Sequence, residues 1–412
     1  MPTIDPQHGI GTLVTHVAEM DNAQDAHVTP IYQTSVFSFP DVQTGASRFK
    51  GDEPGYIYTR LKNPNLDQYA AKIAVLEGLD LLHDQPGRAV EDVVAGMVFA
   101  SGMAAITAAI LARVKGGQAI IAQENIYSAT FNFLHDLAPQ YGIEVVFLKE
   151  SAPADWEAAF ASHPEGVLAF AETPANPNLS IVDLKAAAEI AHRSGAWLMV
   201  DNTFATPYCQ RPLTLGADVV VHSTTKYLSG HGLIVGGAVV SRHLDYIRGP
   251  LTQMFKVLGG CPSPFDSWLA NIGLKTFELR MQRHCESALK IAQYLETHPG
   301  VERVYYPYLQ SHPDVELARR QMLHGGGMIA FELKGGFDAG VALMERVRVA
   351  TLAVSLGNVD TLVSHPASMT HSNVPPEYRL EMGITDGLVR YSVGIENVED
   401  LIADLDQALC PA

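Results

Sequence analysis

The stretch Asp218-Val-Val-Val-His-Ser-Thr-Thr-Lys226 joins a short apolar run to hydroxyl side chains and a lysine. Its residues Val219–Val221 are typical of a buried strand. A second apolar run, Trp197–Val200, ends in a similar way, in the carboxylate of Asp201. Because the carboxyl ends of parallel strands meet at one edge of a sheet, we expect Asp201 and Lys226 to lie close together. The sequence therefore predicts an α/β fold with a ligand site at that edge.

The residue types at this edge are those that a pyridoxal phosphate (PLP) site requires. A lysine forms a Schiff base with the cofactor aldehyde, hydroxyls bind the phosphate, and an aspartate keeps the pyridine nitrogen protonated. A single lysine is usually a solvated surface charge, but Lys226 follows an apolar strand and precedes the glycine-bearing loop Tyr227–Gly232. Burial near a strand end lowers the pKa of a lysine enough for it to act as a nucleophile. We therefore expect Lys226 to be the Schiff-base lysine.

Two further segments are expected at the same sheet edge. Ser101-Gly102-Met103 lies between a predicted strand and a predicted helix. Backbone amides at a helix N-terminus bind phosphate, although the segment is also compatible with a plain tight turn. Tyr127 follows the next predicted strand. Its ring can stack on a planar cofactor and its hydroxyl can act as a general acid, whereas an isolated tyrosine is more often part of the core.

The composition limits the classes of function. The chain has 412 residues, of which 47% are hydrophobic and 18% charged, and this indicates a globular protein of two domains with an arm. Its net charge of −17 argues against nucleic acid as a partner, because phosphate binding needs a basic face. The four cysteines are widely spaced and no histidine spacing is typical of a metal site, so we expect no metal and a reducing cytoplasm.

The N-terminus has no signal-peptide pattern, and no membrane span is expected. The segment Val93–Ala112 is uncharged and long enough to span a bilayer. Ser101-Gly102 interrupts it, however, so a strand followed by a helix explains the segment without lipid.

Apolar runs alternate with helical stretches from about Leu66 onward, an order that predicts a mostly parallel sheet. The seven expected strands are Met97–Ala100, Ala119–Ala122, Val145–Leu148, Val167–Phe170, Trp197–Val200, Val219–Val221 and Gly237–Val240. Ser263-Pro264 then opens a helical region that continues to about Leu295. A smaller α+β domain is expected beyond it, with strands at Val301–Tyr305, Met328–Leu333 and Leu388–Ser392 and a helix at Val398–Leu409.

Two other classes of function find little support in the sequence. The glycines of Gly232–Gly237 do not form the GxGxxG pattern that a nicotinamide oxidoreductase would need. A catalytically idle binding protein on the same scaffold would have lost the lysine or the aspartate, and both are present.

The chain resembles, from about Thr15 to Leu409, the γ-family of PLP enzymes of cysteine and methionine metabolism. The resemblance rests on the motifs Tyr56-Ile57-Tyr58-Thr59-Arg60, Glu172-Thr173-Pro174-Ala175-Asn176-Pro177, Asp201-Asn202-Thr203, Ser223-Thr224-Thr225-Lys226 and His365-Pro366-Ala367-Ser368-Met369-Thr370-His371. It implies the fold type I, or aspartate aminotransferase-like, architecture with a mostly parallel seven-stranded sheet. It also implies an extended N-terminal arm (1–62), a PLP-binding domain (63–277) and a smaller α+β C-terminal domain (278–412).

The same resemblance implies a role for each matching residue. Lys226 holds the cofactor and moves protons, Asp201 pairs with the pyridinium, and Tyr127 stacks on the ring and protonates the leaving sulfur. The rest of the expected set consists of Ser101, Gly102, Met103, Ser223 and Thr225 at the phosphate, Tyr58 and Arg60 at the phosphate of the neighbouring subunit, and Arg390, Ser355 and Asn176 at the substrate carboxylate. Such enzymes are typically homotetramers built from two catalytic dimers.

Members of this family differ in their substrates. Val354 stands where cystathionine-handling members carry glutamate, and valine provides an apolar wall suited to a methyl thioether. The segments Met369–Ser372 and Gly383–Arg390 are most similar to methionine γ-lyases, whereas Ala129 and Phe255–Gly259 depart from them. We expect γ-elimination on L-methionine, with methanethiol, 2-oxobutanoate and ammonia as products. Cystathionine γ-lyase, cystathionine γ-synthase and O-succinyl- or O-acetylhomoserine sulfhydrylase activities are the alternatives.

Overall fold

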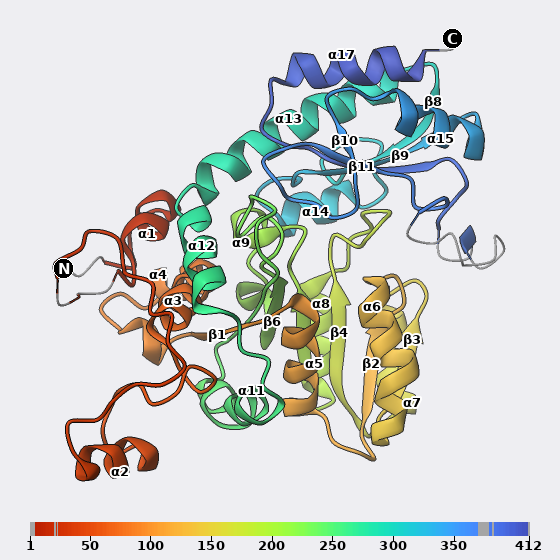
Figure 1. The fold of residues 1–412 in the computed structure, drawn as a ribbon. Helices are drawn as coiled ribbons and strands as arrows, with labels where there is room; N and C mark the ends of the chain where they lie inside the picture. The colour runs from red at the N-terminus through yellow and green to blue at the C-terminus, as the bar shows by residue number, and fades with distance from the viewer. Residues whose placement is uncertain (1–4, 20–21, 23, 370–378, 381–382, 411–412) are drawn as a thin grey trace.

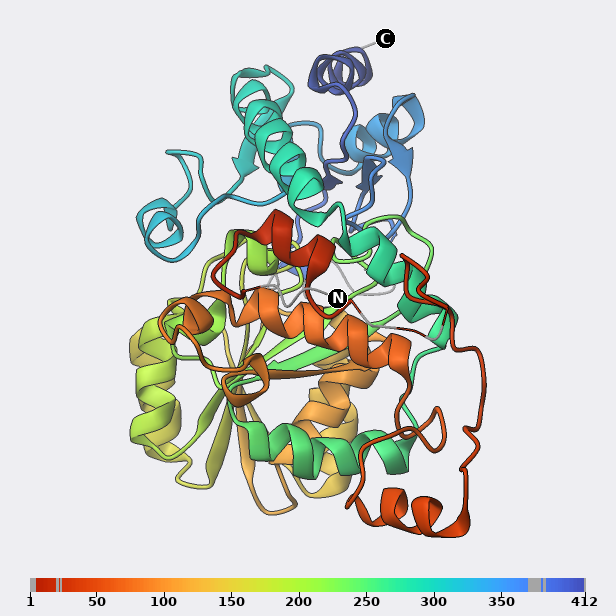
Figure 2. The same cartoon turned by 90° about the vertical axis from the view of Figure 1, so that its left-hand side faces the viewer.

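The computed structural model describes residues 5–19, 22, 24–369, 379–380 and 383–410. Figure 1 shows a larger sheet in the lower part of the molecule and a smaller, C-terminal sheet above it. Helix α13 (Phe277–Thr297) packs on strands of the smaller sheet and descends toward the larger part, as Figure 2 shows from the side. The expected α/β class with a smaller C-terminal α+β domain is confirmed.

The large sheet has seven strands in the order β1-β7-β6-β5-β4-β2-β3. The strands are β1 (Ala95–Phe99), β2 (Ala119–Gln123), β3 (Glu144–Leu148), β4 (Gly166–Glu172), β5 (Trp197–Asp201), β6 (Val219–Ser223) and β7 (Gly237–Ser241). Strand β7 pairs antiparallel with β1 and β6, and the remaining pairs are parallel. All seven expected strands are confirmed. They could be predicted because strands covered by helices on both faces are apolar along their length.

Helices pack against the strands of the large sheet. α3 contacts β1 and β7, α5 contacts β6 and β7, and α8 contacts β4 and β5. In the part of the chain that the structure describes, the helices besides α13 are α1 (Ile10–His16), α2 (Val42–Lys50), α3 (Pro64–Glu77), α4 (Leu79–His83), α5 (Gly102–Arg113), α6 (Ser128–Asn132), α7 (Pro153–Ser162), α8 (Leu184–Arg193), α9 (Thr206–Cys209), α10 (Leu244–Tyr246), α11 (Thr252–Leu258), α12 (Pro264–Leu274), α14 (Val315–Gln321), α15 (Gly336–Arg346) and α17 (Val398–Leu409).

The uncharged segment Val93–Ala112 forms strand β1 and most of helix α5, as expected. Ser101 caps α5, because its Oγ accepts a hydrogen bond from the backbone N–H of Ala104 at 3.0 Å. Over the described ranges, no helix has the length and apolar character needed to cross a bilayer.

The C-terminal sheet has the strand order β10-β11-β12-β9-β8. The expected strands β8 (Val301–Tyr305), β9 (Met328–Leu333) and β12 (Leu388–Ser392) and the closing helix α17 are confirmed. The sequence did not indicate β10 (Thr351–Leu352) and β11 (Leu362–Ser364), because runs of two and three residues are too short to show a period.

The helical region predicted from Ser263 to about Leu295 is corrected to two helices, α12 and α13. Arg280 on α13 stabilises the break between these two helices through hydrogen bonds. Its guanidinium donates to the carbonyl oxygen of Gly273 at 3.0 Å and to that of Tyr227 at 2.7 Å. The end of α12 therefore depends on a partner from another helix, which the apolar pattern cannot reveal.

The N-terminal region, predicted as extended, contains helices α1 and α2. α1 packs against α3 and buries Leu13 and Val14, whereas α2 stands apart from the rest of the fold at the lower left of Figure 1. Helices this short depend on tertiary contacts for stability, and their sequence pattern is correspondingly weak.

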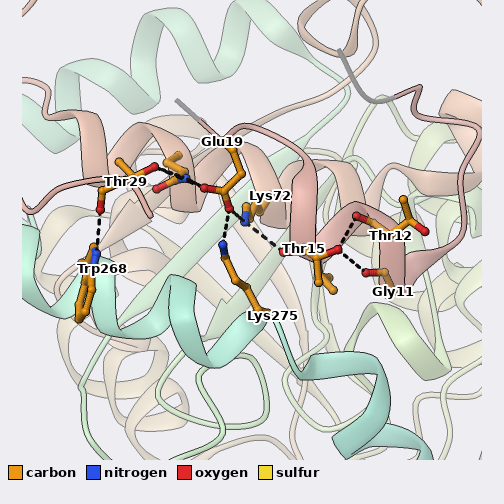
Figure 3. A network of polar contacts seen from close by, with 10 residues as sticks. Gly11, Thr12, Thr15, Glu19, Thr29, Lys72, Trp268 and Lys275 are labelled. Atoms are coloured by element: carbon orange, nitrogen blue, oxygen red, sulfur yellow. Dashed lines mark hydrogen bonds and ion pairs between the residues drawn. The ribbon is translucent and has the colours of Figure 1, made fainter. Parts of the chain in front are cut away.

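A buried ion-pair network fixes the first part of this region to the large domain (Figure 3). The Oε1 atom of Glu19 lies 2.7 Å from Nζ of Lys72 on α3 and 2.8 Å from Nζ of Lys275, which follows α12. The indole Nε1 of Trp268 donates to the carbonyl oxygen of Thr29 at 2.9 Å. Because the Lys72 side chain is fully buried, loss of Glu19 would leave an uncompensated charge in the interior.

Candidate active site

A cavity of about 520 Å³ lies where the carboxyl edge of the large sheet meets the C-terminal domain. The expected site residues that line it are Ser101, Gly102, Met103, Tyr127, Asn176, Asp201, Ser223, Thr225, Lys226, Ser355 and Arg390. A volume of this size suits a small-molecule site. The structure therefore brings together the whole expected set apart from Tyr58 and Arg60.

Two buried carboxylates lie side by side at the sheet edge. Glu172 ends β4, Asp201 ends β5, and the two residues are paired in the sheet register. Burial raises the pKa of Asp201, although hydrogen bonds from Thr203 act in the opposite direction. Burial and repulsion by Asp201 raise the pKa of Glu172 to about 8. A pair of this kind favours a cationic ligand, because each carboxylate raises the cost of ionising the other.

Glu172 was not among the predicted site residues, although it lies in one of the motifs that carry the resemblance. It follows the apolar run Val167–Phe170 just as Asp201 follows the run Trp197–Val200. The sequence signal that could have identified Glu172 was therefore a carboxylate after an apolar run, the same signal that identified Asp201.

Lys226 lines the cavity and contacts the C-terminal domain directly. Its Nζ donates a hydrogen bond to Oγ of Ser355 at 2.7 Å. Burial, with a smaller contribution from Arg390, lowers the pKa of Lys226 to about 8. A fraction of this amine is therefore unprotonated at neutral pH, the state in which it is nucleophilic. Ser355 itself has a φ of 92°, a left-handed value that non-glycine residues adopt mainly where the surroundings enforce it.

The other end of the cavity is suited to a phosphate. α5 begins at Gly102, where an added Cβ would lie 2.9 Å from Cβ of Ser223, so the close approach requires glycine. The first N–H groups of α5 have no acceptor within the helix. The backbone N–H of Ser223 donates to Oγ1 of Thr203 at 2.9 Å, and Oγ1 of Thr225 accepts from the N–H of Gly236 at 3.0 Å. The N-terminus of α5 and the hydroxyls of Ser223 and Thr225 thus lie at one end of the same cavity.

Arg390 on β12 brings a buried guanidinium to the cavity. Its Nη1 donates to Oδ1 of Asn176 at 3.2 Å, and its Nη2 donates to the carbonyl oxygen of Ser355 at 3.0 Å. Burial lowers the pKa of Arg390, yet a guanidinium stays protonated in proteins. Since both acceptors are uncharged, the positive charge is available to an incoming carboxylate.

Tyr127 precedes α6, lines the cavity and is 46% exposed. Tyr58 and Arg60 are not among the residues that line this cavity. The Arg60 guanidinium lies over the Tyr58 ring, 5.4 Å from its centroid, and donates to the carbonyl oxygen of Lys256 at 2.5 Å. Their place at the phosphate of a neighbouring subunit stays a prediction. Of the last motif, Pro366 lines the cavity, whereas Thr370 and His371 lie outside the described residues.

The residues present fit pyridoxal phosphate. The cavity offers an aldehyde the amine of Lys226, a pyridine nitrogen the buried carboxylate of Asp201, and a phosphate the N-terminus of α5 with the hydroxyls of Ser223 and Thr225. A family profile described as Cys/Met metabolism PLP-dependent enzyme matches residues 11–410. The chain belongs to this family. It is therefore an enzyme whose cofactor is pyridoxal phosphate.

Relatives in the Cys/Met metabolism PLP-dependent family match almost the whole chain. The L-methionine gamma-lyase of Porphyromonas gingivalis is 48% identical over 403 residues, which are 97% of each protein. The cystathionine gamma-lyase of Bacillus subtilis is 41% identical over 389 residues, 94% of this chain and 96% of the relative. The crystal structure of cystathionine gamma synthase from Xanthomonas oryzae pv. oryzae in complex with aminoacrylate and cysteine matches with a TM-score of 0.88 and 37% identity, covering 98% of each chain. The expected fold type I architecture is confirmed.

Proposed function

We propose that this enzyme catalyses γ-elimination on L-methionine, which consumes one water and releases methanethiol, 2-oxobutanoate and ammonia. The 48% identity to an L-methionine gamma-lyase supports this assignment. The observation that carries the choice of substrate is the apolar side chain of Val354 in the cavity wall, with Val235 and Leu356 also lining the cavity. Among the described residues, the carboxylates that line the cavity are Glu172 and Asp201, and both lie at the sheet edge. Within that part of the chain, Val354 therefore leaves no anionic partner for the distal ammonium of cystathionine.

The proposed chemistry assigns a task to each part of the cavity. When bound, pyridoxal phosphate supplies an electron sink for negative charge that develops at Cα and Cβ of the substrate. Arg390 binds the α-carboxylate, while Asn176 holds its guanidinium in place. Lys226, with a pKa of about 8, takes the proton from Cα and returns protons to the substrate through Nζ. The hydroxyl of Tyr127, a residue that lines the cavity, donates a proton to the departing sulfur.

Two positions at which this chain differs from methionine γ-lyases lie outside the apolar wall of the cavity. Ala129 lies on α6, and Phe255 is buried in an edge-to-face contact with Phe99, with 5.5 Å between ring centroids. Neither Ala129 nor Phe255 is among the residues that line the cavity. The substrate contacts that this chain provides by itself are therefore compatible with methionine.

The substrate assignment is tested with purified, cofactor-loaded enzyme and L-methionine, L-cystathionine or O-succinyl-L-homoserine, with 2-oxobutanoate and free thiol measured separately. We expect 2-oxobutanoate and methanethiol in equal amounts from methionine. Turnover of cystathionine without turnover of methionine would contradict the proposal and favour the activity of the Bacillus subtilis relative. Turnover of the homoserine ester only when a thiol is added would favour a γ-replacement enzyme instead.

We further propose a homotetramer of two catalytic dimers, in which Tyr58 and Arg60 complete the phosphate site of the neighbouring subunit. Apolar side chains on the same part of the chain support an interface there, since Val36, Val42 and Phe49 are 60%, 89% and 69% exposed. Helix α2, which carries two of them, also stands apart from the rest of the fold (Figure 1).

Shared sites predict complementation between two inactive variants. K226A and R60A each damage one half of a site, but a mixed dimer contains one site with both natural residues. Equal mixing after reversible dissociation should therefore restore about a quarter of the natural activity, the value expected from random pairing. An inactive mixture, with mixed dimers shown by mass spectrometry, would contradict the shared site.

We also propose a cytoplasmic location. All four cysteines, Cys209, Cys261, Cys285 and Cys410, are free. The Sγ atoms of Cys209 and Cys285 lie 3.6 Å apart as thiols, and a reducing compartment preserves such a pair.

A further inference from the structure

Glu172 joins two walls of the cavity through its carboxylate. Oε2 accepts a hydrogen bond from the backbone N–H of Tyr127 at 2.8 Å, and Oε1 accepts from the backbone N–H of Asn176 at 3.0 Å. The residue is 4% exposed, and its own N–H donates to Oε1 of Gln123 on β2. One rigid carboxylate at a strand end therefore fixes two separate loops.

Each of these loops carries a group proposed to act on the bound molecules. The first presents the Tyr127 ring, and the second presents Asn176, whose Oδ1 accepts from Arg390 Nη1 at 3.2 Å. The chain of contacts from Glu172 through Asn176 reaches Arg390 on β12 of the C-terminal domain. A change at Glu172 would thus move the guanidinium without touching it.

We infer that Glu172 is a positioning residue, which sets the Tyr127 ring and the Asn176–Arg390 pair in the geometry that binds an α-amino acid carboxylate. The inference rests on the proposed function, in which Arg390 binds that carboxylate. A carboxylate suits the task because two N–H donors converge on its two oxygens. Glutamine has one acceptor oxygen, so E172Q must turn an NH₂ group toward one of the two donors.

Glycine is the probe for the test, because it has the α-amino and α-carboxylate groups but no γ-substituent to eliminate. Its dissociation constant from cofactor-loaded enzyme is measured by calorimetry. E172Q should weaken glycine binding about 10-fold or more, the loss expected when one buried N–H donor is left without an acceptor. E172D, which keeps the carboxyl group but is one methylene shorter, should also weaken it.

A double-mutant cycle separates positioning from general destabilisation. The N176A substitution already removes the hydrogen bond between Asn176 and Arg390. In that background E172Q should therefore weaken glycine binding by less than about 2-fold. Equal effects of E172Q in the two backgrounds would overturn the inference. The visible circular dichroism of the bound cofactor should also decrease in E172Q, because the Tyr127 ring is less well ordered.

Two reference variants distinguish the possible failures. D218N changes a buried carboxylate at the opposite end of the sheet and should leave glycine binding unchanged. R390A should weaken glycine binding at least as much as E172Q does. If R390A has no effect, the proposed function is wrong; if R390A weakens binding and neither E172Q nor E172D does, the role of Glu172 alone is wrong.

Discussion

Asp201 and Asp218 are both buried carboxylates on the large sheet, but they lie at opposite ends of its strands. Asp201 ends β5 at the cavity, where its Oδ1 accepts from the backbone N–H of Thr203 at 3.0 Å. Asp218 precedes β6 at the other end. There its carboxylate oxygens lie 2.8 Å from Nε2 of His192 and 2.7 Å from Nε2 of His243.

The two environments shift the pKa in opposite directions. Hydrogen bonds from His243 and His192 and from a backbone N–H outweigh burial and lower the pKa of Asp218. Burial dominates at Asp201 and raises its pKa, and the neighbouring Glu172 is also a carboxylate. The carboxylate of Asp218 at the amino end of the sheet is thus stabilised by neighbouring groups of the protein itself. At the carboxyl end, burial opposes the ionisation of Asp201 and Glu172, and a bound cation such as a pyridinium would favour it.

The largest effect is expected for the substitution of Lys226, the proposed nucleophile at the cavity end of the sheet. K226A should lower the rate of 2-oxobutanoate formation by about 10⁴-fold or more, because the covalent attachment of the cofactor and the proton transfers depend on one amine. The variant should retain the far-ultraviolet circular dichroism of the natural protein. Residual turnover within 10-fold of the natural rate, on the order of one lost hydrogen bond, would contradict its role.

The next effect comes from D201N, which removes the proposed partner of the pyridinium. We expect turnover to fall about 10²-fold or more, as for loss of a preorganised electrostatic partner. The cofactor-free protein, however, should unfold at the same or a higher temperature, because an ionised Asp201 is unfavourable there without a cation. A large fall in the melting temperature of the cofactor-free D201N protein would show that Asp201 is mainly structural.

D218N should give the opposite result. We expect a loss of about 1–3 kcal/mol in the free energy of unfolding, because two histidines and a backbone N–H lose a charged acceptor. The values of kcat and KM should stay within about 2-fold, the ordinary range for a change away from the site. Denaturant unfolding and steady-state kinetics on the same preparation make the comparison with D201N direct.

The smallest expected effect is a pH dependence of the cofactor-free protein. The pKa of Glu172 is raised from 4.5 to about 8 on folding, so its protonated form favours the folded state. That contribution is complete below pH 4.5 and is lost as the pH rises through 8, with a slope of at most about 1.4 kcal/mol per pH unit. E172Q should flatten the melting temperature between pH 5 and 8, and an unchanged slope would contradict the shift. Asp218 contributes the reverse dependence, since its pKa is lowered and its stabilisation disappears as the pH falls below its ordinary value of 3.8.

The sequence predicts the residues at the carboxyl edge of the large sheet better than it predicts the surrounding helices and the C-terminal domain. Apolar runs such as Val219–Val221 identify strands because both faces of the sheet are buried, and polar groups that follow them mark the carboxyl edge. The break between α12 and α13 could not be predicted, because it depends on Arg280 from a different helix. Arg390 and Ser355 came only from the family resemblance, since no local pattern shows that β12 faces the large sheet.

The central claim is that the amine of Lys226 holds the cofactor at the edge prepared by Asp201. The most direct test is reduction of the cofactor-loaded enzyme with borohydride, followed by proteolysis and mass spectrometry of the peptides. We predict loss of the visible absorbance and one reduced cofactor per chain, on the peptide that contains Lys226. A reduced cofactor on another lysine, or its absence from every peptide, would contradict the account.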